Sequence, residues 1–187
     1  MGQHDDQNER DAEPTDLALV ARWKAGDERA ATTLVARHAP AMARDVTSLG
    51  GNEIVDEVVQ DAFVRAFESL AAFRGDSSLR TWLFTIVRRL MIDRRRAERR
   101  QAGRTSLEEG HAATEYGALD RLVAVETESR VRAAIERLTA TQREVFTLRV
   151  AEGLSYREIA EVVGTTEGAA RVHYHNAVRA VKEFVNE

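Results

Sequence analysis

Eight arginines between residues 88 and 104 are the densest group of chemically committed side chains in this 187-residue chain. Only Asp93 and Glu98 offset them, so the segment carries a net charge of +6. Guanidinium groups bind phosphate oxygens in a bidentate manner, and clustered arginines are a common mark of nucleic-acid binding. A solvated helix face can have the same composition, so the arginine run alone leaves both interpretations open.

Acidic segments flank the arginine block on both sides. Residues 1–16 contain six acidic residues and one arginine, and residues 105–128 have the same ratio, so each segment has a net charge of −5. The whole chain has a formal net charge of −4. This balance argues against a simple coat protein for nucleic acid, and it predicts weak binding of the free chain to DNA.

Other kinds of site chemistry find little support in the sequence. The absence of cysteine excludes disulfides, thiolate zinc sites and cysteine nucleophiles. Asp56, Glu57 and Asp61 would share a helix face, as metal ligands of a nuclease do, but no further acidic or histidine set completes such a site. His173 and His175 also lack further ligands nearby. We expect no metal, no cofactor and no enzymatic activity.

The apolar runs are only a few residues long, far below the roughly 20 residues that cross a bilayer. The first residues have neither a basic start nor an apolar stretch, so we do not expect a secretory signal there. The expected location is the cytoplasm, with no membrane insertion.

The elements that position these side chains are predicted to be helices. Only two prolines occur, and helix formers dominate. Capping residues and apolar spacing predict helices over residues 16–25, 27–49 and 55–70, with a kink or split at Pro40. A fourth helix, capped by Ser77 or Ser78, buries a stripe that includes Trp82 and runs into the arginine block. Trp23 and Trp82 are both expected in the core.

Residues 139–184 contain three helix starts in sequence. Thr139 with Gln142 and Ser155 with Glu158 form two capping boxes, and Thr166 can cap a third helix. The segment matches the helix-turn-helix pattern: a short helix over residues 155–163, a tight turn at residues 164–166 and a longer helix over residues 167–184. Arg171 and Asn176 are then the expected base readers, since arginine pairs with guanine and asparagine with adenine. A helical hairpin that only packs remains the alternative.

Two strings in the N-terminal half resemble the second conserved region of bacterial sigma factors. They are DEVVQDAFVRAF at residues 56–67 and FRGDSSLRTWL at residues 73–83. The second string closely resembles the signature of the extracytoplasmic-function group of the sigma-70 family. Residues 138–145 and 152–160 are similar to that group's fourth region. The resemblance extends over nearly the whole chain.

The resemblance implies an all-α protein of two small helical domains. These are a sigma-two helical bundle at residues 15–100 and a sigma-four helix-turn-helix domain at residues 128–187. A disordered tail at residues 1–14 would precede them, and an acidic flexible linker at residues 101–127 would join them. By analogy, this linker would thread near the active-site channel of RNA polymerase. The sequence leaves open whether the two domains pack on each other in the free protein.

The resemblance also assigns roles to residues. The minus-ten promoter element would be read and melted by a loop and the helix after it, which capture flipped bases and hold phosphates. The residues expected there are Arg74, Asp76, Ser77, Arg80, Arg88, Arg89, Arg94, Arg95 and Arg96. The minus-thirty-five element would be read as duplex by Glu167, Arg171, Val172, His173, His175 and Asn176. The string EGAARVH at residues 167–173 departs from the family's usual VGTVKSR, so the preferred bases cannot be transferred.

The expected partners are core RNA polymerase, promoter DNA and an anti-sigma factor. The resemblance implies docking of Asp56, Glu57, Gln60 and Asp61 on the β′ clamp helices, and a further contact with the β flap. A stand-alone helix-turn-helix regulator that needs no polymerase is the alternative, but it leaves the arginine-rich helix unexplained.

Overall fold

The computed structural model describes residues 13–70, 73–102 and 130–186. The helices are α1 (Asp16–Lys24), α2 (Glu28–Ser48), the 3-10 helix η1 (Asn52–Ile54), α3 (Val55–Ser69), α4 (Leu79–Ala102), α6 (Ala140–Val150), α7 (Tyr156–Val163) and α8 (Glu167–Asn186). Residues 130–136 are also helical. No strand occurs within these ranges, so the predicted all-α fold class is confirmed. The expected N-terminal tail and most of the expected linker lie outside the described residues.

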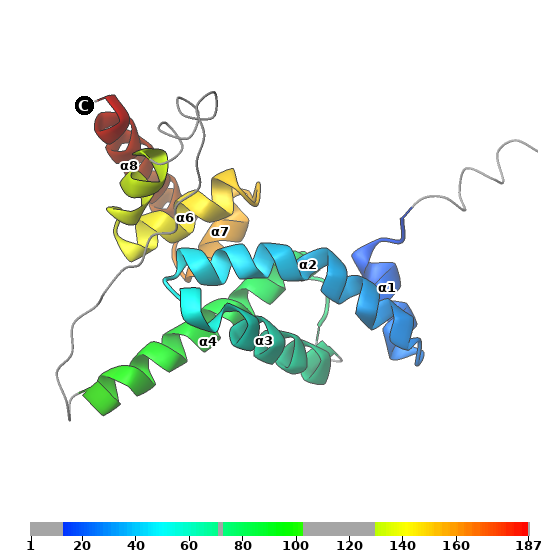
Figure 1. The fold of residues 1–187 in the computed structure, drawn as a ribbon. Coiled ribbons are helices and arrows are strands. Elements are labelled where there is room, and N and C mark those ends of the chain that lie inside the picture. The colour runs from blue at the N-terminus through cyan, green and yellow to red at the C-terminus, as the bar shows by residue number, and fades with distance from the viewer. Residues whose placement is uncertain (1–12, 71–72, 103–129, 187) are drawn as a thin grey trace, which may run out of the picture.

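The helices form an N-terminal group, α1 to α4, and a C-terminal group, α6 to α8, that pack directly against each other. Helices α2 and α4 lie between α3 on one side and the C-terminal group on the other (Figure 1). Helix α2 contacts α6, and α4 contacts α7. A single hydrophobic cluster includes Met42 and Phe84 from the first group and Leu148 and Ile159 from the second. The sequence left open whether the two halves of the chain pack on each other, and in the structure they do so through this shared core.

Side-chain caps begin the helices where the sequence predicts them. The hydroxyl of Thr15 accepts a hydrogen bond from the backbone N–H of Ala18 at 3.2 Å. Both predicted capping boxes are present, at Thr139 and Ser155. The hydroxyl of Thr166 accepts from the backbone N–H of Ala169 at 3.1 Å. These local bonds explain why most of the predicted helix starts agree with the observed ones within one residue.

Helix α2 continues through Pro40 without the split that was one of two expected outcomes. Proline lacks the N–H that would bond to the preceding turn, so one backbone hydrogen bond is missing there. The flanking side chains of His38, Ala41 and Met42 are all buried. Tertiary packing on both sides of Pro40 therefore holds the helix together.

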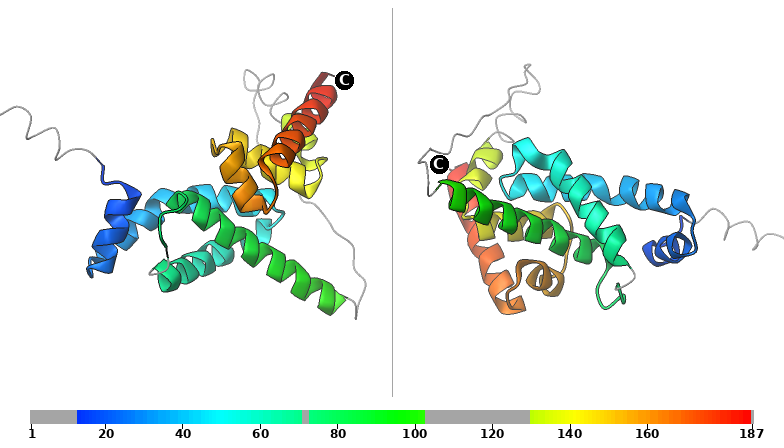
Figure 2. Two further views of the ribbon diagram at one scale, coloured as in Figure 1. Left: turned by 180° about the vertical axis from the view of Figure 1, so that it is seen from behind. Right: turned by 90° about the horizontal axis from the view of Figure 1, so that it is seen from below.

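Helix α4 is buried more extensively than the sequence predicts. Part of the predicted stripe is buried, and Trp82 is half-buried against Phe73, with ring centroids 5.2 Å apart. Phe84 and Val87 lie outside that stripe and are also fully buried. The reason is that α7 packs against a second face of α4. Only the C-terminal end of α4 projects beyond the other helices, as Figure 2 shows.

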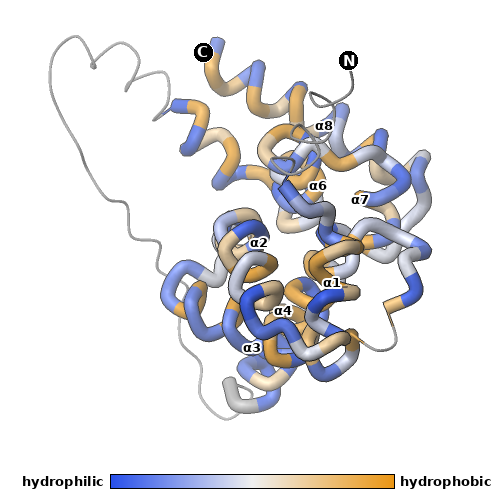
Figure 3. The backbone as a smooth tube through the Cα atoms, turned by 90° about the vertical axis from the view of Figure 1, so that its right-hand side faces the viewer, coloured by the Kyte–Doolittle hydropathy of each residue, from blue (hydrophilic) through white to orange (hydrophobic). Residues whose placement is uncertain are grey.

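Helix α8 has the amphipathic character that the sequence predicts. Hydrophobic and hydrophilic segments alternate along it in Figure 3. Ala170 and Ala177 are buried, while Tyr174 lies 6.3 Å from the ring of Phe146 on α6. Among the helices of the described ranges, none combines the length and apolarity that a bilayer crossing requires.

Candidate nucleic-acid interface

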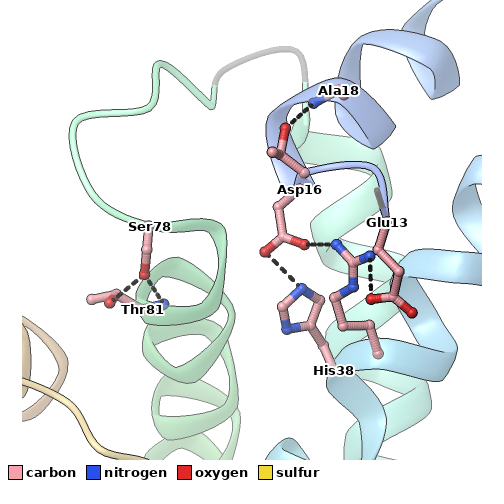
Figure 4. A network of polar contacts seen from close by, with 8 residues as sticks. Glu13, Asp16, Ala18, His38, Ser78 and Thr81 are labelled. Atoms are coloured by element: carbon pink, nitrogen blue, oxygen red, sulfur yellow. Dashed lines mark hydrogen bonds and ion pairs between the residues drawn. The ribbon is translucent and has the colours of Figure 1, made fainter. Parts of the chain in front are cut away.

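The loop at residues 73–78 is held at both ends and exposed in its middle. Gly75 has φ +77°, a left-handed conformation that glycine adopts without strain. The hydroxyl of Ser78 accepts a hydrogen bond from the backbone N–H of Thr81 at 3.0 Å and so caps α4, as Figure 4 shows. Arg74 and Asp76 are exposed between these anchors, and Ser77 is half-buried. The loop therefore presents polar side chains from a fixed backbone.

Exposed arginines continue along the projecting end of α4. Arg89 and Arg96 are both exposed. Arg96 lines a shallow groove together with Asp93, Arg99 and Arg100. The side chains of Arg89 and Arg96 are open to solvent, so they can reach phosphate oxygens from the exposed surface of α4.

Arg94 and Arg95 are used inside the N-terminal group. One guanidinium nitrogen of Arg94 lies 2.8 Å from Glu57 Oε1 and 2.9 Å from Asp61 Oδ2, both on α3. Arg95 donates a hydrogen bond to the backbone carbonyl of Leu49, at the end of α2. The two side chains tie α4 to its neighbours, so in this arrangement they are less available to DNA than Arg89 and Arg96.

Arg80 and Arg88 are paired with carboxylates of the C-terminal group. Arg80 binds Glu152, and Nε of Arg88 lies 2.7 Å from Glu144 Oε1. The Glu152 side chain has no exposed area, and that of Glu144 is 4% exposed. Two of the residues predicted to contact the minus-ten element thus carry counter-charges from the other half of the chain.

The buried acidic residues that lie between the N-terminal and C-terminal helix groups were not predicted from the sequence. Glu144 and Glu152 occupy ordinary positions in α6 and in the turn after it, where no local pattern indicates burial. Burial raises the pKa of Glu144 despite its pairing with Arg88. The burial of Asp45 could have been predicted from the sequence, because this residue lies between Met42 and Leu49 on the apolar stripe of α2. A charged residue in such a stripe indicates a special environment.

The outward face of α8 presents a mixed set of polar and apolar groups. Arg171, Val172 and His175 are exposed, whereas His173 and Asn176 are half-buried. The predicted residues therefore lie on α8, directly after the turn at Gly164, whose φ is +70°.

Arg171 is supported by two neighbours. One of its guanidinium nitrogens lies 3.0 Å from the Glu167 carboxylate, and its guanidinium carbon lies 5.1 Å from the ring centre of Tyr156. Charge pairing and stacking together restrict the rotamers of this long side chain. Arg171 is thereby held at the start of the helix.

The acidic face predicted for polymerase lies on α3. Asp56 and Gln60 are exposed there. Hydrogen bonding to Arg94 holds the pKa of the Glu57 carboxyl below its ordinary value. Glu57 and Asp61 are thus already partnered within the fold, which leaves Asp56 and Gln60 as the more accessible members of the set.

Glu57 and Asp61, the acidic residues that could suggest a metal site, are paired with an arginine. Within residues 13–70, 73–102 and 130–186, no three His, Asp or Glu side chains cluster in a way that could hold a metal ion. The charges of Glu57 and Asp61 are met by the guanidinium of Arg94. These acidic residues therefore act as partners of an arginine in this fold.

Two family models match the chain. Sigma-70 region 2 matches residues 34–101, and Sigma-70, region 4 matches residues 128–181. The extracytoplasmic-function (ECF) RNA polymerase sigma-E factor of Escherichia coli (strain K12) is 32% identical over 180 residues, covering 91% of this chain and 94% of that protein. The protein of the same name from Haemophilus influenzae is 31% identical, with 91% and 95% covered.

Two solved structures have a similar fold. The sigma factor RpoE from Bartonella quintana, in complex with the anti-sigma factor NepR, gives a TM-score of 0.69 at 26% identity and covers 83% of this chain and 96% of its own. CnrH, in complex with the cytosolic domain of CnrY, gives a TM-score of 0.65 at 30% identity, with 91% and 97% covered. Sequence and fold thus indicate the same group of proteins.

Proposed function

We infer, from the premise that this chain belongs to the extracytoplasmic-function group of sigma-70 factors, that it binds core RNA polymerase and directs it to promoters. The observation that carries this inference is the joint match of region 2 and region 4 to one chain, in order and over most of its length. A stand-alone helix-turn-helix regulator would account for α7 and α8 only, so it is not favoured.

The proposed division of labour follows the two helix groups. We propose residues 15–100 as the sigma-two domain, which opens the minus-ten element, and residues 128–187 as the sigma-four domain, which reads the minus-thirty-five element as duplex. Residues 101–127 would join them as an acidic linker. The exposed loop at residues 73–78 would receive flipped bases, and the exposed arginines of α4 would hold phosphates of the single strand.

The protein is proposed to supply specificity and no chemistry of its own. Phosphodiester bond formation would belong to the polymerase, so the chain is not assigned an enzymatic activity. Its place of action would be the cytoplasm, where polymerase and chromosome meet. Both similar solved structures contain an anti-sigma factor or a cytosolic partner domain, which supports the proposal that an inhibitor protein also binds this chain.

Run-off transcription tests the proposed function. Core polymerase alone and core polymerase with this chain are compared on a library of randomised promoters, with a gel shift in parallel. Initiation at a shared pair of elements only in the presence of the chain is expected. Specific duplex binding by the chain without polymerase, and no initiation with it, would favour the stand-alone regulator instead.

The double variant R89A/R96A is expected to weaken binding of the single-stranded minus-ten element through lost phosphate contacts. Each phosphate contact to a single strand contributes about 0.7 to the slope of log affinity against log salt, so the slope should fall by about 1.4. Fluorescence anisotropy of the holoenzyme with a labelled oligonucleotide, measured across salt concentrations, gives the slope. R29A/R65A, which removes two exposed arginines elsewhere, should leave the slope unchanged.

The variant R171A is expected to flatten the preference for one base of the minus-thirty-five element. A good bidentate contact contributes about 1–3 kcal/mol of discrimination against the wrong base, and the Arg171 side chain is held in place for such a contact. Transcription from promoters varied at each position measures the preference. K182A, about three turns further along α8, serves as the control, and an unchanged base profile in R171A would refute the assignment.

A further inference from the structure

One line of α4 is covered by the chain's own C-terminal helices. Arg80, Phe84 and Arg88 follow each other at intervals of four residues, so they lie along one face of the helix. Phe84 has no exposed area, and both arginines bind carboxylates of the C-terminal group. The face that carries two of the proposed minus-ten residues is therefore the face on which the two helix groups meet.

Glu152 is the centre of this contact. Its carboxylate binds Arg80 of α4 and accepts two hydrogen bonds from Arg44 of α2, at 2.7 Å and 3.2 Å. Its side chain is completely buried, although it lies in the turn between α6 and α7. An oxyanion held by two guanidinium groups has the geometry with which arginines bind a phosphate.

We propose that the C-terminal helices act as an internal inhibitor, in which Glu144 and Glu152 occupy Arg88 and Arg80 in place of promoter phosphates. The two helix groups must then separate before the minus-ten strand can bind. We call the five residues of this contact (Arg44, Arg80, Arg88, Glu144 and Glu152) the ionic latch. The proposal rests on the proposed role of α4 in promoter opening and adds a means of regulating it.

The ionic latch is suited to release by nucleic acid. When the groups separate, Arg80 and Arg88 would each exchange a carboxylate for a phosphate, so their ion pairing is replaced rather than lost. The apparent affinity for DNA then equals the intrinsic affinity reduced by the fraction of molecules that are open. Weakening the latch should therefore tighten DNA binding by raising the fraction of open molecules.

Asp45 of α2 is a buried carboxyl close to the charged residues of the ionic latch. Its side chain is fully buried, and neither carboxylate oxygen has a hydrogen-bond partner among the residues that the structure describes. The charged groups that act on it are Glu144 from α6, Glu152 from the following turn and Arg88 from α4. Burial first, and then the two glutamates, raise the pKa of Asp45 well above its ordinary value.

The direction of the pH dependence follows from this raised pKa. Between the ordinary pKa of aspartate and the raised pKa of Asp45, the closed form would hold a proton on this carboxyl, and separation of the groups would hydrate the carboxyl and release that proton. The closed form is therefore fully favoured below the ordinary pKa of aspartate and becomes less favoured as pH rises through the higher pKa of the closed form. D45N, which resembles the protonated side chain, should remove this dependence.

The test measures the separation of the two helix groups in the full chain. Because the sequence has no cysteine, E68C on α3 and K182C on α8 provide two unique positions for a donor and an acceptor dye. The otherwise unaltered chain should show high energy transfer, and E144Q/E152Q should shift it to low transfer. The same variant should bind a single-stranded minus-ten oligonucleotide about tenfold more tightly, since more molecules are open.

A matched control separates the latch from a general charge effect. E136Q/E161Q removes two exposed carboxylates from the C-terminal half and leaves the latch intact. High transfer and unchanged oligonucleotide affinity are expected for it. If it tightens binding as much as E144Q/E152Q does, or if E144Q/E152Q keeps high transfer, the proposal is overturned.

D45N provides a second test in the opposite direction. It should keep high transfer at a pH where the parent chain begins to open, whereas a generally destabilising substitution would open the chain earlier. If circular dichroism shows that E144Q/E152Q does not fold, this pH titration decides the matter, and an unchanged profile in D45N would count against the proposal. Run-off transcription distinguishes failure of the ionic latch from failure of the proposed sigma function. If the chain supports initiation but shows low energy transfer under all conditions, the latch alone is refuted. If the latch behaves as expected but no initiation occurs, the sigma function alone is refuted.

Discussion

D56R is expected to abolish stable binding of this chain to core RNA polymerase. Asp56 is exposed on the face of α3 proposed for docking. Polymerase surfaces that accept an acidic face present basic side chains, and a like-charge contact at an interface costs several kcal/mol. A loss of about 2.7 kcal/mol already corresponds to a hundredfold weaker affinity. Titration of labelled chain with core polymerase measures this affinity.

The control for D56R is E28R, which should destabilise the start of a helix to a similar extent without changing the docking face. Asp56 lies in the first turn of α3, where an acidic residue interacts favourably with the helix dipole, so its replacement by arginine also destabilises the helix slightly. Glu28 lies in the first turn of α2 and is exposed, and E28R therefore incurs the same helix effect away from the docking face. Equal polymerase affinity in D56R and E28R would remove Asp56 from the interface.

F84A is expected to be the most destabilising single substitution proposed here. Phe84 is among the largest side chains with no exposed area, and it lies on the face of α4 that meets the C-terminal helices. Truncating a buried phenylalanine to alanine costs about 3–5 kcal/mol, a large part of the total stability of a small domain. Urea unfolding followed by circular dichroism should show this loss as a lower midpoint.

Two further variants give the scale for F84A. F84L keeps most of the buried volume and should cost less than about 1.5 kcal/mol. V64A removes two methyl groups from a half-exposed position on α3 and should change stability by less than about 0.5 kcal/mol. If F84A unfolds at the same urea concentration as V64A, the shared core between the two helix groups is not formed in solution.

The sequence predicted local structure well because local structure depends on neighbouring residues. The capping boxes at Thr139 and Ser155 join residues three positions apart, and the left-handed turn at Gly164 depends on the residue itself. The stripe of α4 could be read from its spacing, but the burial of Phe84 could not. A helix with a second covered face loses its simple periodicity, and the covering helix α7 comes much later in the chain.

The candidate site also combines features that depend on neighbouring residues with features that depend on tertiary packing. The sequence by itself determined that a helix rich in arginine follows a polar loop, and that a helix-turn-helix lies near the C-terminus. Only the tertiary structure decided which arginines are available, since Arg94 pairs with α3 while Arg89 and Arg96 remain exposed. Arg44 and Glu152 meet across 108 positions of sequence. An ion pair to a buried carboxylate of that kind depends on how two helix groups pack, and no local pattern of residues encodes it.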